Sequence, residues 1–130
     1  MSKENSFKII NKDLEGLFGK LSVYTDEDLN KKMNKNKWSI AENLYHLWLT
    51  EFITIKYIKK KTSYPESLVN VSYFSKFKMK LLELIFFTGV KMKAPKITYD
   101  SMPQNIEIKK LRETWIKSRK SFEVLVNALD

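Results

Sequence analysis

The sequence contains no cysteine, so disulfides, thiolate zinc sites and cysteine nucleophiles are excluded. A cysteine-free chain suits a reducing compartment, and we expect a cytoplasmic protein. Glycine and proline are scarce, with three of each, and this scarcity favours long helices over a β architecture with many turns. We also expect no signal peptide and no membrane-spanning segment. The N-terminal residues have no apolar core, and the most apolar run, residues 81–90, is about half a bilayer span.

Arginine is rare as well, although the net charge is +9. The only arginines are Arg112 and Arg119, and nearly all the positive charge comes from lysines spread along the chain. Recognition of phosphates and bases favours the planar guanidinium of arginine. We therefore expect most lysines to lie on solvated faces. A lysine-rich nucleic-acid-binding module is the weaker alternative, and its binding would fall steeply with salt.

Apolar residues recur at spacings of three and four along four segments, which is typical of amphipathic helices. These segments span residues 7–21, 40–60, 71–88 and 105–129. A shorter acidic segment, capped by Thr25, indicates a short helix that ends near Lys32. No segment alternates as a strand would. Four long helices and a short one, with brief connections, predict one all-α domain over residues 1–130, folded as an up-and-down helical bundle.

The last two long segments each carry an apolar stripe, and that of the last segment is the most regular in the sequence. The stripe of the third consists of Phe74, Phe77, Leu81, Leu84 and Ile85, and Gly89 is placed to end that helix. The stripe of the last consists of Ile108, Leu111, Trp115, Ser118, Phe122, Leu125 and Leu129. In the first helix, Gly16 and Gly19 either reduce stability by about 1 kcal/mol each or allow another backbone to approach closely.

The sharpest helix start in the sequence is a capping box, Ser39-x-x-Glu42, in which each side chain can bond the other residue's backbone amide. His46, the only histidine, follows Glu42 by one turn, so the two side chains are neighbours on the helix surface. His46 is either a boundary histidine or a metal ligand or general base in a cleft between helices. One imidazole alone cannot hold a catalytic zinc ion, which uses three protein ligands.

Glu51 interrupts the apolar stripe of the same helix. A carboxylate in such a stripe either accepts hydrogen bonds from Trp or Tyr, pairs with Lys or Arg of a neighbouring helix, or serves as a functional carboxylate in a pocket. With Glu42, Trp48 and Tyr57 it forms a candidate pocket near His46. The tryptophans themselves are expected mainly in the core. These patterns name no catalytic residue.

The stretch from Trp38 to Glu51 resembles the DinB-like superfamily, which includes the bacillithiol and mycothiol transferases. Trp38-Ser39-x-x-Glu42 followed by His46-Leu47 matches the helix start of that family, and Glu51 falls where the family often has an acid. The resemblance implies a helical bundle with a divalent metal ion, usually zinc or nickel, held by three histidines. One of these would be His46, and the other two would follow at His-x-x-x-His spacing on a last helix.

The chain departs from that pattern, because it has no second histidine and ends where the last helix of the family would follow. We therefore expect a DinB-like bundle with a degenerate metal site and no bound cofactor, which binds a small molecule or has a stress-linked role. The alternative is a thiol transferase or hydrolase that uses a divalent metal ion at His46. A groove left by a missing last helix would be covered by residues 71–88 or by a second subunit, and we expect a homodimer.

Overall fold

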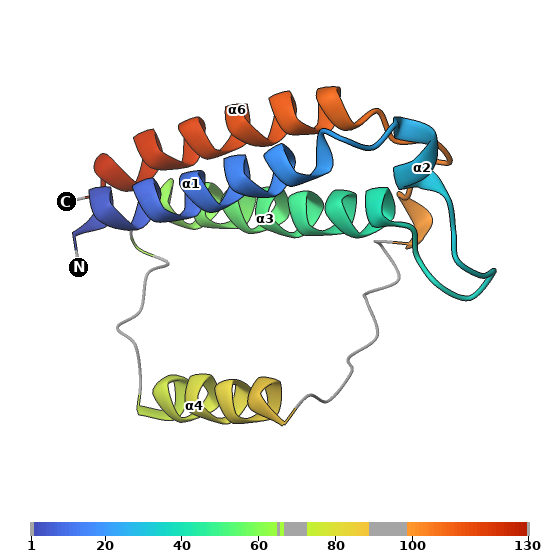
Figure 1. Cartoon of the computed structure of the whole chain (residues 1–130). Coiled ribbons are helices and arrows are strands. Elements are labelled where there is room, and N and C mark those ends of the chain that lie inside the picture. The colour runs from blue at the N-terminus through green and yellow to red at the C-terminus, as the bar shows by residue number, and fades with distance from the viewer. Residues whose placement is uncertain (1, 65, 67–72, 89–98, 130) are drawn as a thin grey trace.

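A computed structural model describes residues 2–64, 66, 73–88 and 99–129 (Figure 1). Within these residues the chain forms helices and no strands, which confirms the predicted all-α class. The helices are α1 (Lys3–Leu21), α2 (Asp26–Asn30), α3 (Ile40–Thr62), α4 (Tyr73–Phe87) and α6 (Ile108–Asn127). The predicted helix end at Gly89 lies outside the described residues.

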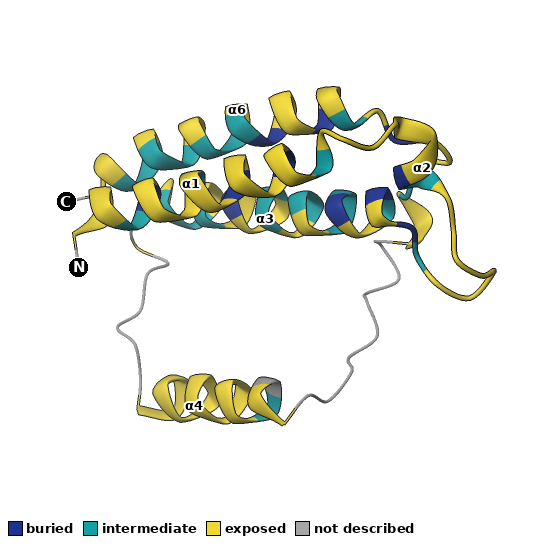
Figure 2. Ribbon diagram, in the orientation of Figure 1, coloured by how far each residue is buried: buried dark blue, intermediate teal, exposed yellow. Residues whose placement is uncertain are grey.

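Three long helices, α1, α3 and α6, run side by side, and the short helix α2 caps one end of the group (Figure 1). Both α1 and α3 pack against α6, while α2 packs against α3. Phe18 of α1 meets the ring of Trp115 edge-on at a centroid distance of 6.0 Å. The core consists of Leu14, Phe18, Leu29, Ala41, Leu44, Ile106, Leu111 and Trp115. Figure 2 shows this core as a dark band toward the α2 end of the bundle.

A pair of backbone-directed hydrogen bonds joins α2 to the segment that leads into α6. The Asn30 side-chain amide donates to the Ile106 carbonyl at 2.8 Å, and its oxygen accepts from the Ile106 amide at 2.9 Å. Ile106 is only 4% exposed, so water cannot replace these partners well. Asn30 therefore fixes the entry of α6 into the bundle.

Helix α4 stands apart from the other helices, and its residues are exposed almost throughout (Figures 1 and 2). The predicted stripe forms on one helix face, but Phe74 is 66% exposed, Phe77 64% and Leu84 59%. Local contacts support this helix, for example the Lys78 ammonium over the Phe74 ring, 4.8 Å from the ring centroid. The stripe of α4 consequently has no apolar partner of comparable extent among the described residues.

The observed helix ends differ from the predicted ones most clearly at the start of α1. Helix α1 begins at Lys3, one turn earlier than expected, because the Ser2 hydroxyl accepts from the Asn5 amide. Helix α6 begins at Ile108 and ends at Asn127, within the predicted range. At Gly16 and Gly19 an added Cβ would meet nothing within 4 Å, so neither glycine serves a close backbone approach.

Candidate functional site

The predicted capping box starts α3, and it carries an additional ion pair. The Ser39 hydroxyl accepts from the Glu42 amide at 3.1 Å, and the Glu42 carboxylate accepts from the Ser39 amide at 2.7 Å. Lys32 reaches the other Glu42 oxygen at 2.9 Å. Burial opposes the charged form, but the Lys32 ammonium and the Ser39 amide outweigh it and hold the pKa of the Glu42 carboxyl below its usual value. Glu42 is therefore a charged structural group.

His46 lies one turn further along α3, within an aromatic cluster. Its ring meets Trp38 edge-on at a centroid distance of 5.1 Å, and Trp38 in turn meets Tyr99 at 5.3 Å. The Nδ1 atom of His46 is buried and has no hydrogen-bond partner among the described residues. Such an unsatisfied nitrogen is uncommon in a histidine with a purely structural role.

Glu51 lies at the centre of a hydrogen-bond clamp that ties α3 to α6. Its two oxygens accept from Arg119 at 2.8 and 3.0 Å, and one of them also accepts from the Trp115 indole at 2.9 Å. A third Arg119 nitrogen donates to the Ile10 carbonyl of α1. The guanidinium also lies over the Trp115 ring at 5.6 Å. Glu51 thus makes both of the structural contacts considered for it, a hydrogen bond from a tryptophan and an ion pair with an arginine of a neighbouring helix.

Trp48 lines a cavity between α3 and the start of α6, with a volume of about 310 Å³. Its ring is stacked on Phe52 and tilted against Tyr45, both at a centroid distance of 5.3 Å. The cavity residues are Tyr45, Trp48, Pro103, Asn105, Ile106, Glu107, Lys110, Leu111 and Thr114. Aromatic walls with a few polar groups at the rim are typical of small-molecule sites.

The candidate pocket residues do not converge on one point. Glu51 faces a groove between α1 and α3 that Leu47 and Arg119 also line. Tyr57 is 60% exposed, and the Lys61 ammonium lies over its ring at 5.9 Å. Trp48 faces the cavity toward α6. Only Glu42 and His46 stay neighbours, as their spacing requires.

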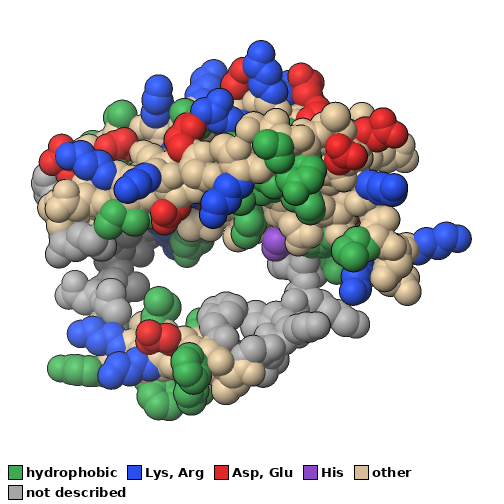
Figure 3. Space-filling view, in the orientation of Figure 1, with side chains coloured by type: hydrophobic (Ala, Val, Ile, Leu, Met, Phe, Trp, Pro, Cys, Tyr) green, Lys and Arg blue, Asp and Glu red, His purple; other side chains and the backbone are tan. Residues whose placement is uncertain are grey.

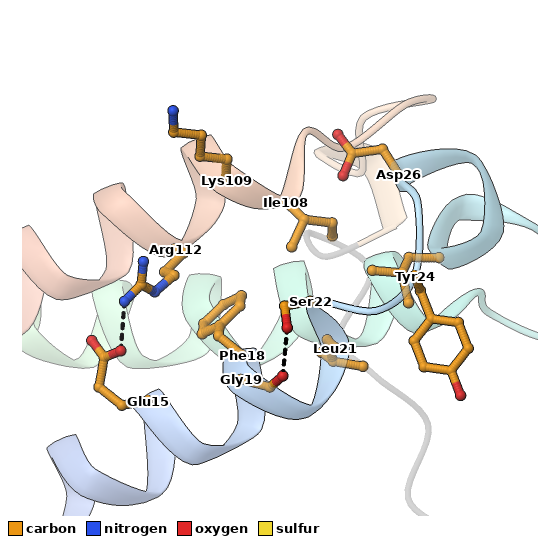
Figure 4. Close-up of a pocket in the computed structure, with 11 residues that line it drawn as sticks. Glu15, Phe18, Gly19, Leu21, Ser22, Tyr24, Asp26, Ile108, Lys109 and Arg112 are labelled. Atoms are coloured by element: carbon orange, nitrogen blue, oxygen red, sulfur yellow. Dashed lines mark hydrogen bonds and ion pairs between the residues drawn. The ribbon is translucent and has the colours of Figure 1, made fainter.

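A second cavity, of about 390 Å³, lies between α1, α2 and the start of α6 (Figure 4). Phe18, Leu21 and Ile108 give it an apolar lining, while Arg112 of α6 meets Glu15 of α1 at 2.5 Å on its rim. Lys109 points away from the cavity in Figure 4. The Arg112 charge on the rim of this cavity is paired with Glu15 and is therefore less available to a ligand.

The sequence did not reveal Arg119 and Lys110 as parts of these arrangements. Arg119 follows Trp115 by one turn, on the face of α6 that carries the apolar stripe. An arginine on that face, in a chain with only one other arginine, was the available signal for the Glu51 clamp. Lys110 carried no such signal, because its place at the cavity depends on how α3 and α6 pack.

The donor set does not fit a resident metal ion. No group of three or more His, Asp or Glu side chains in the described part of the chain is placed to hold one. Glu42 is committed to the capping box and Lys32, and Glu51 to Arg119 and Trp115. His46 is left as a single imidazole, whereas metal sites of this type use at least three protein ligands.

The surface charges are dispersed. On the face shown in Figure 3, Lys and Arg side chains alternate with Asp and Glu and do not form one continuous basic patch. None of the helices described above is long and apolar enough to cross a membrane.

Comparison with known proteins gives one finding. Searches of curated proteins and of solved structures gave no significant match. The sequence profile of the DinB superfamily matches residues 7–130, which is nearly the whole chain. The match agrees with the helix start at Ser39 and with the helical architecture described above. The chain therefore belongs to the DinB superfamily.

Proposed function

We propose that this DinB-superfamily protein binds a small organic acid with an aromatic or apolar body, without a resident metal ion. The observation that supports the proposal is the cavity at Trp48, which combines aromatic walls with the ammonium of Lys110. Tyr45 and Trp48 offer flat apolar surfaces to a ring. Lys110 has no ion-pair partner among the described residues, so its charge is available to a ligand carboxylate.

Three probes with the same ring test the class of ligand: 2-naphthoate, 2-naphthol and 2-naphthylmethylamine. We expect 2-naphthoate to raise the melting temperature most, because it alone pairs with Lys110. In the Lys110→Gln variant the advantage of the acid over the alcohol should disappear. Lys117→Gln removes an exposed lysine of the same helix that does not line the cavity, and it should leave the advantage intact.

Two results would overturn this assignment. If none of the three probes changes the melting temperature up to its solubility limit, the cavity does not bind such ligands. If the amine stabilises the protein more than the acid does, the ligand class is wrong, and Glu107 rather than Lys110 is the charged contact in the cavity.

The absence of a resident metal ion is tested separately, by metal analysis of protein purified without an affinity tag. We expect far less than one zinc or nickel ion per chain and no change of metal content in His46→Ala. The competing proposal, a metal-dependent thiol transferase or hydrolase, is favoured by the unsatisfied Nδ1 of His46. Stoichiometric metal that is lost in His46→Ala would establish that alternative and refute ours.

A further inference from the structure

An apolar groove between α1 and α3 is open on the surface of the bundle. Ile10 and Leu17 of α1 form one wall and Leu47 of α3 the other, with exposed fractions of 38%, 36% and 53%. The groove has a volume of about 350 Å³, and Leu14 and Trp115 lie at its base. Exposed leucine and isoleucine side chains gathered in one groove mark a surface that a partner covers.

The same chain carries a second exposed apolar surface, the stripe of α4. Phe77 and Leu84 are about two-thirds exposed, at 64% and 59%, and Leu81 is 45% exposed. Figure 3 shows apolar side chains gathered on α4, away from the bundle. The eight buried residues of the main core cluster include none from α4. Among the described residues of the single chain, therefore, neither the groove nor the stripe has an apolar partner of its own size.

We propose that α4 of a second copy of this chain occupies the groove, and that two copies exchange their α4 helices reciprocally. The exchange is symmetric, since each chain donates one stripe and offers one groove, and it therefore closes at two copies. It needs no surface other than the two that the single chain leaves open.

Size and charge support this occupant. Helix α4 has 15 residues and is about 22 Å long, so it fits along α3, which has 23 residues. Covering the exposed apolar surface of both stripes and both grooves buries roughly 1,200 Å², which is at the lower end of the range for stable interfaces. Lys78 and Lys80 flank the stripe, and Asp13 on the groove wall has no ion-pair partner among the described residues.

The absence of cysteine makes cross-linking a direct test. Light scattering should give twice the chain mass of 15.4 kDa. After a Leu47→Cys variant and a Leu81→Cys variant are unfolded together and refolded, a short bismaleimide should join the two different chains. As a matched control, Leu81→Cys mixed with Val124→Cys should not cross-link, because Val124 is 71% exposed on α6 and lies outside the groove.

A double Leu47→Cys, Leu81→Cys variant distinguishes exchange from docking within one chain. If it is refolded with a large excess of the cysteine-free protein, its cross-linked product should be lost, because each double-variant chain then pairs with an unlabelled copy. A cross-link that survives dilution and migrates as a monomer would overturn the proposal.

Two more results would overturn it: a monomeric mass at micromolar concentration, and a Phe77→Lys variant that remains dimeric. Because the main core cluster contains no α4 residue, Phe77→Lys should keep the helical circular dichroism of the bundle while losing the dimer. Retained helicity thus separates loss of the interface from loss of folding.

Discussion

The clamp of Glu51 and Arg119 gives the sharpest stability prediction. Arg119→Met removes the guanidinium but keeps an apolar stem of similar length. It leaves the Glu51 carboxylate, whose side chain is 25% exposed, with the Trp115 indole as its remaining donor. It also removes the bond to the Ile10 carbonyl. The free energy of unfolding should therefore fall.

The magnitude follows from the burial of the pair. Removing one partner of a fully buried pair costs about 3–5 kcal/mol, while a hydrogen bond to a charged group contributes about 1.5–3 kcal/mol. Water can reach Glu51 in part, so we expect a loss of about 3 kcal/mol for Arg119→Met. A loss of that size lowers the melting temperature of a domain of this length by about 10 °C.

A double-mutant cycle isolates the interaction. Urea unfolding is measured for Arg119→Met, Glu51→Leu, the double variant and the parent protein, with circular dichroism at the helical band. The double variant should lose about 1.5 kcal/mol less than the sum of the single variants, because it leaves no unpaired charge. Lys120→Met, an exposed neighbour of Arg119, should change stability by less than about 0.5 kcal/mol.

The reasoning would be refuted by additivity. If the two single variants sum to the double variant within about 0.3 kcal/mol, Glu51 and Arg119 do not stabilise each other in solution. A loss for Arg119→Met no larger than that of Lys120→Met would refute it as well.

Three further predictions concern stability. At pH 7, Glu42→Gln should lower the unfolding free energy by about 0.5–1 kcal/mol. Because the pKa of Glu42 is lowered in the folded state, this difference should begin to shrink near the unfolded value of 4.5 and be lost as the pH falls through the lower folded pKa; a constant gap in urea titrations from pH 7 to 3 would contradict it. Asn30→Ala should lower the free energy of unfolding in urea by about 2 kcal/mol, since the buried amide and carbonyl of Ile106 lose their partners; a change under about 0.5 kcal/mol would show that the Asn30–Ile106 hydrogen bonds do not stabilise the fold. Gly16→Ala and Gly19→Ala should each raise the melting temperature by about 3–5 °C, since the added methyl meets nothing; a decrease would show a hidden steric contact.

The helices could be predicted from the sequence because their signals are local. Spacings of three and four place α3, α4 and α6, and the Ser39 and Thr25 caps start α3 and α2 as expected. The start of α1 was predicted late, because the polar residues before Phe7 carry no apolar spacing, although Ser2 is a capping residue. Membership of the DinB superfamily also followed from a contiguous motif, from Trp38 to Glu51.

The candidate site could be predicted only in part. His46 and Glu42 are neighbours because they share one helix turn. The cavity at Trp48 requires Lys110 and Ile106 from the other end of the chain, and no spacing within one helix can specify such a contact.

The sequence by itself determined where helices form, how two of them are capped, and that at most one histidine is present for any metal ion. Only the tertiary structure decided what each polar side chain binds. Glu51 and Arg119 are 68 residues apart, and Asn30 and Ile106 are 76 apart. Contacts over such separations depend on how helices pack, whereas caps and periodicity depend on residues within one or two turns. For that reason the sequence left Glu51 open between structural and functional roles, and the packing of α3 on α6 assigned it to the clamp.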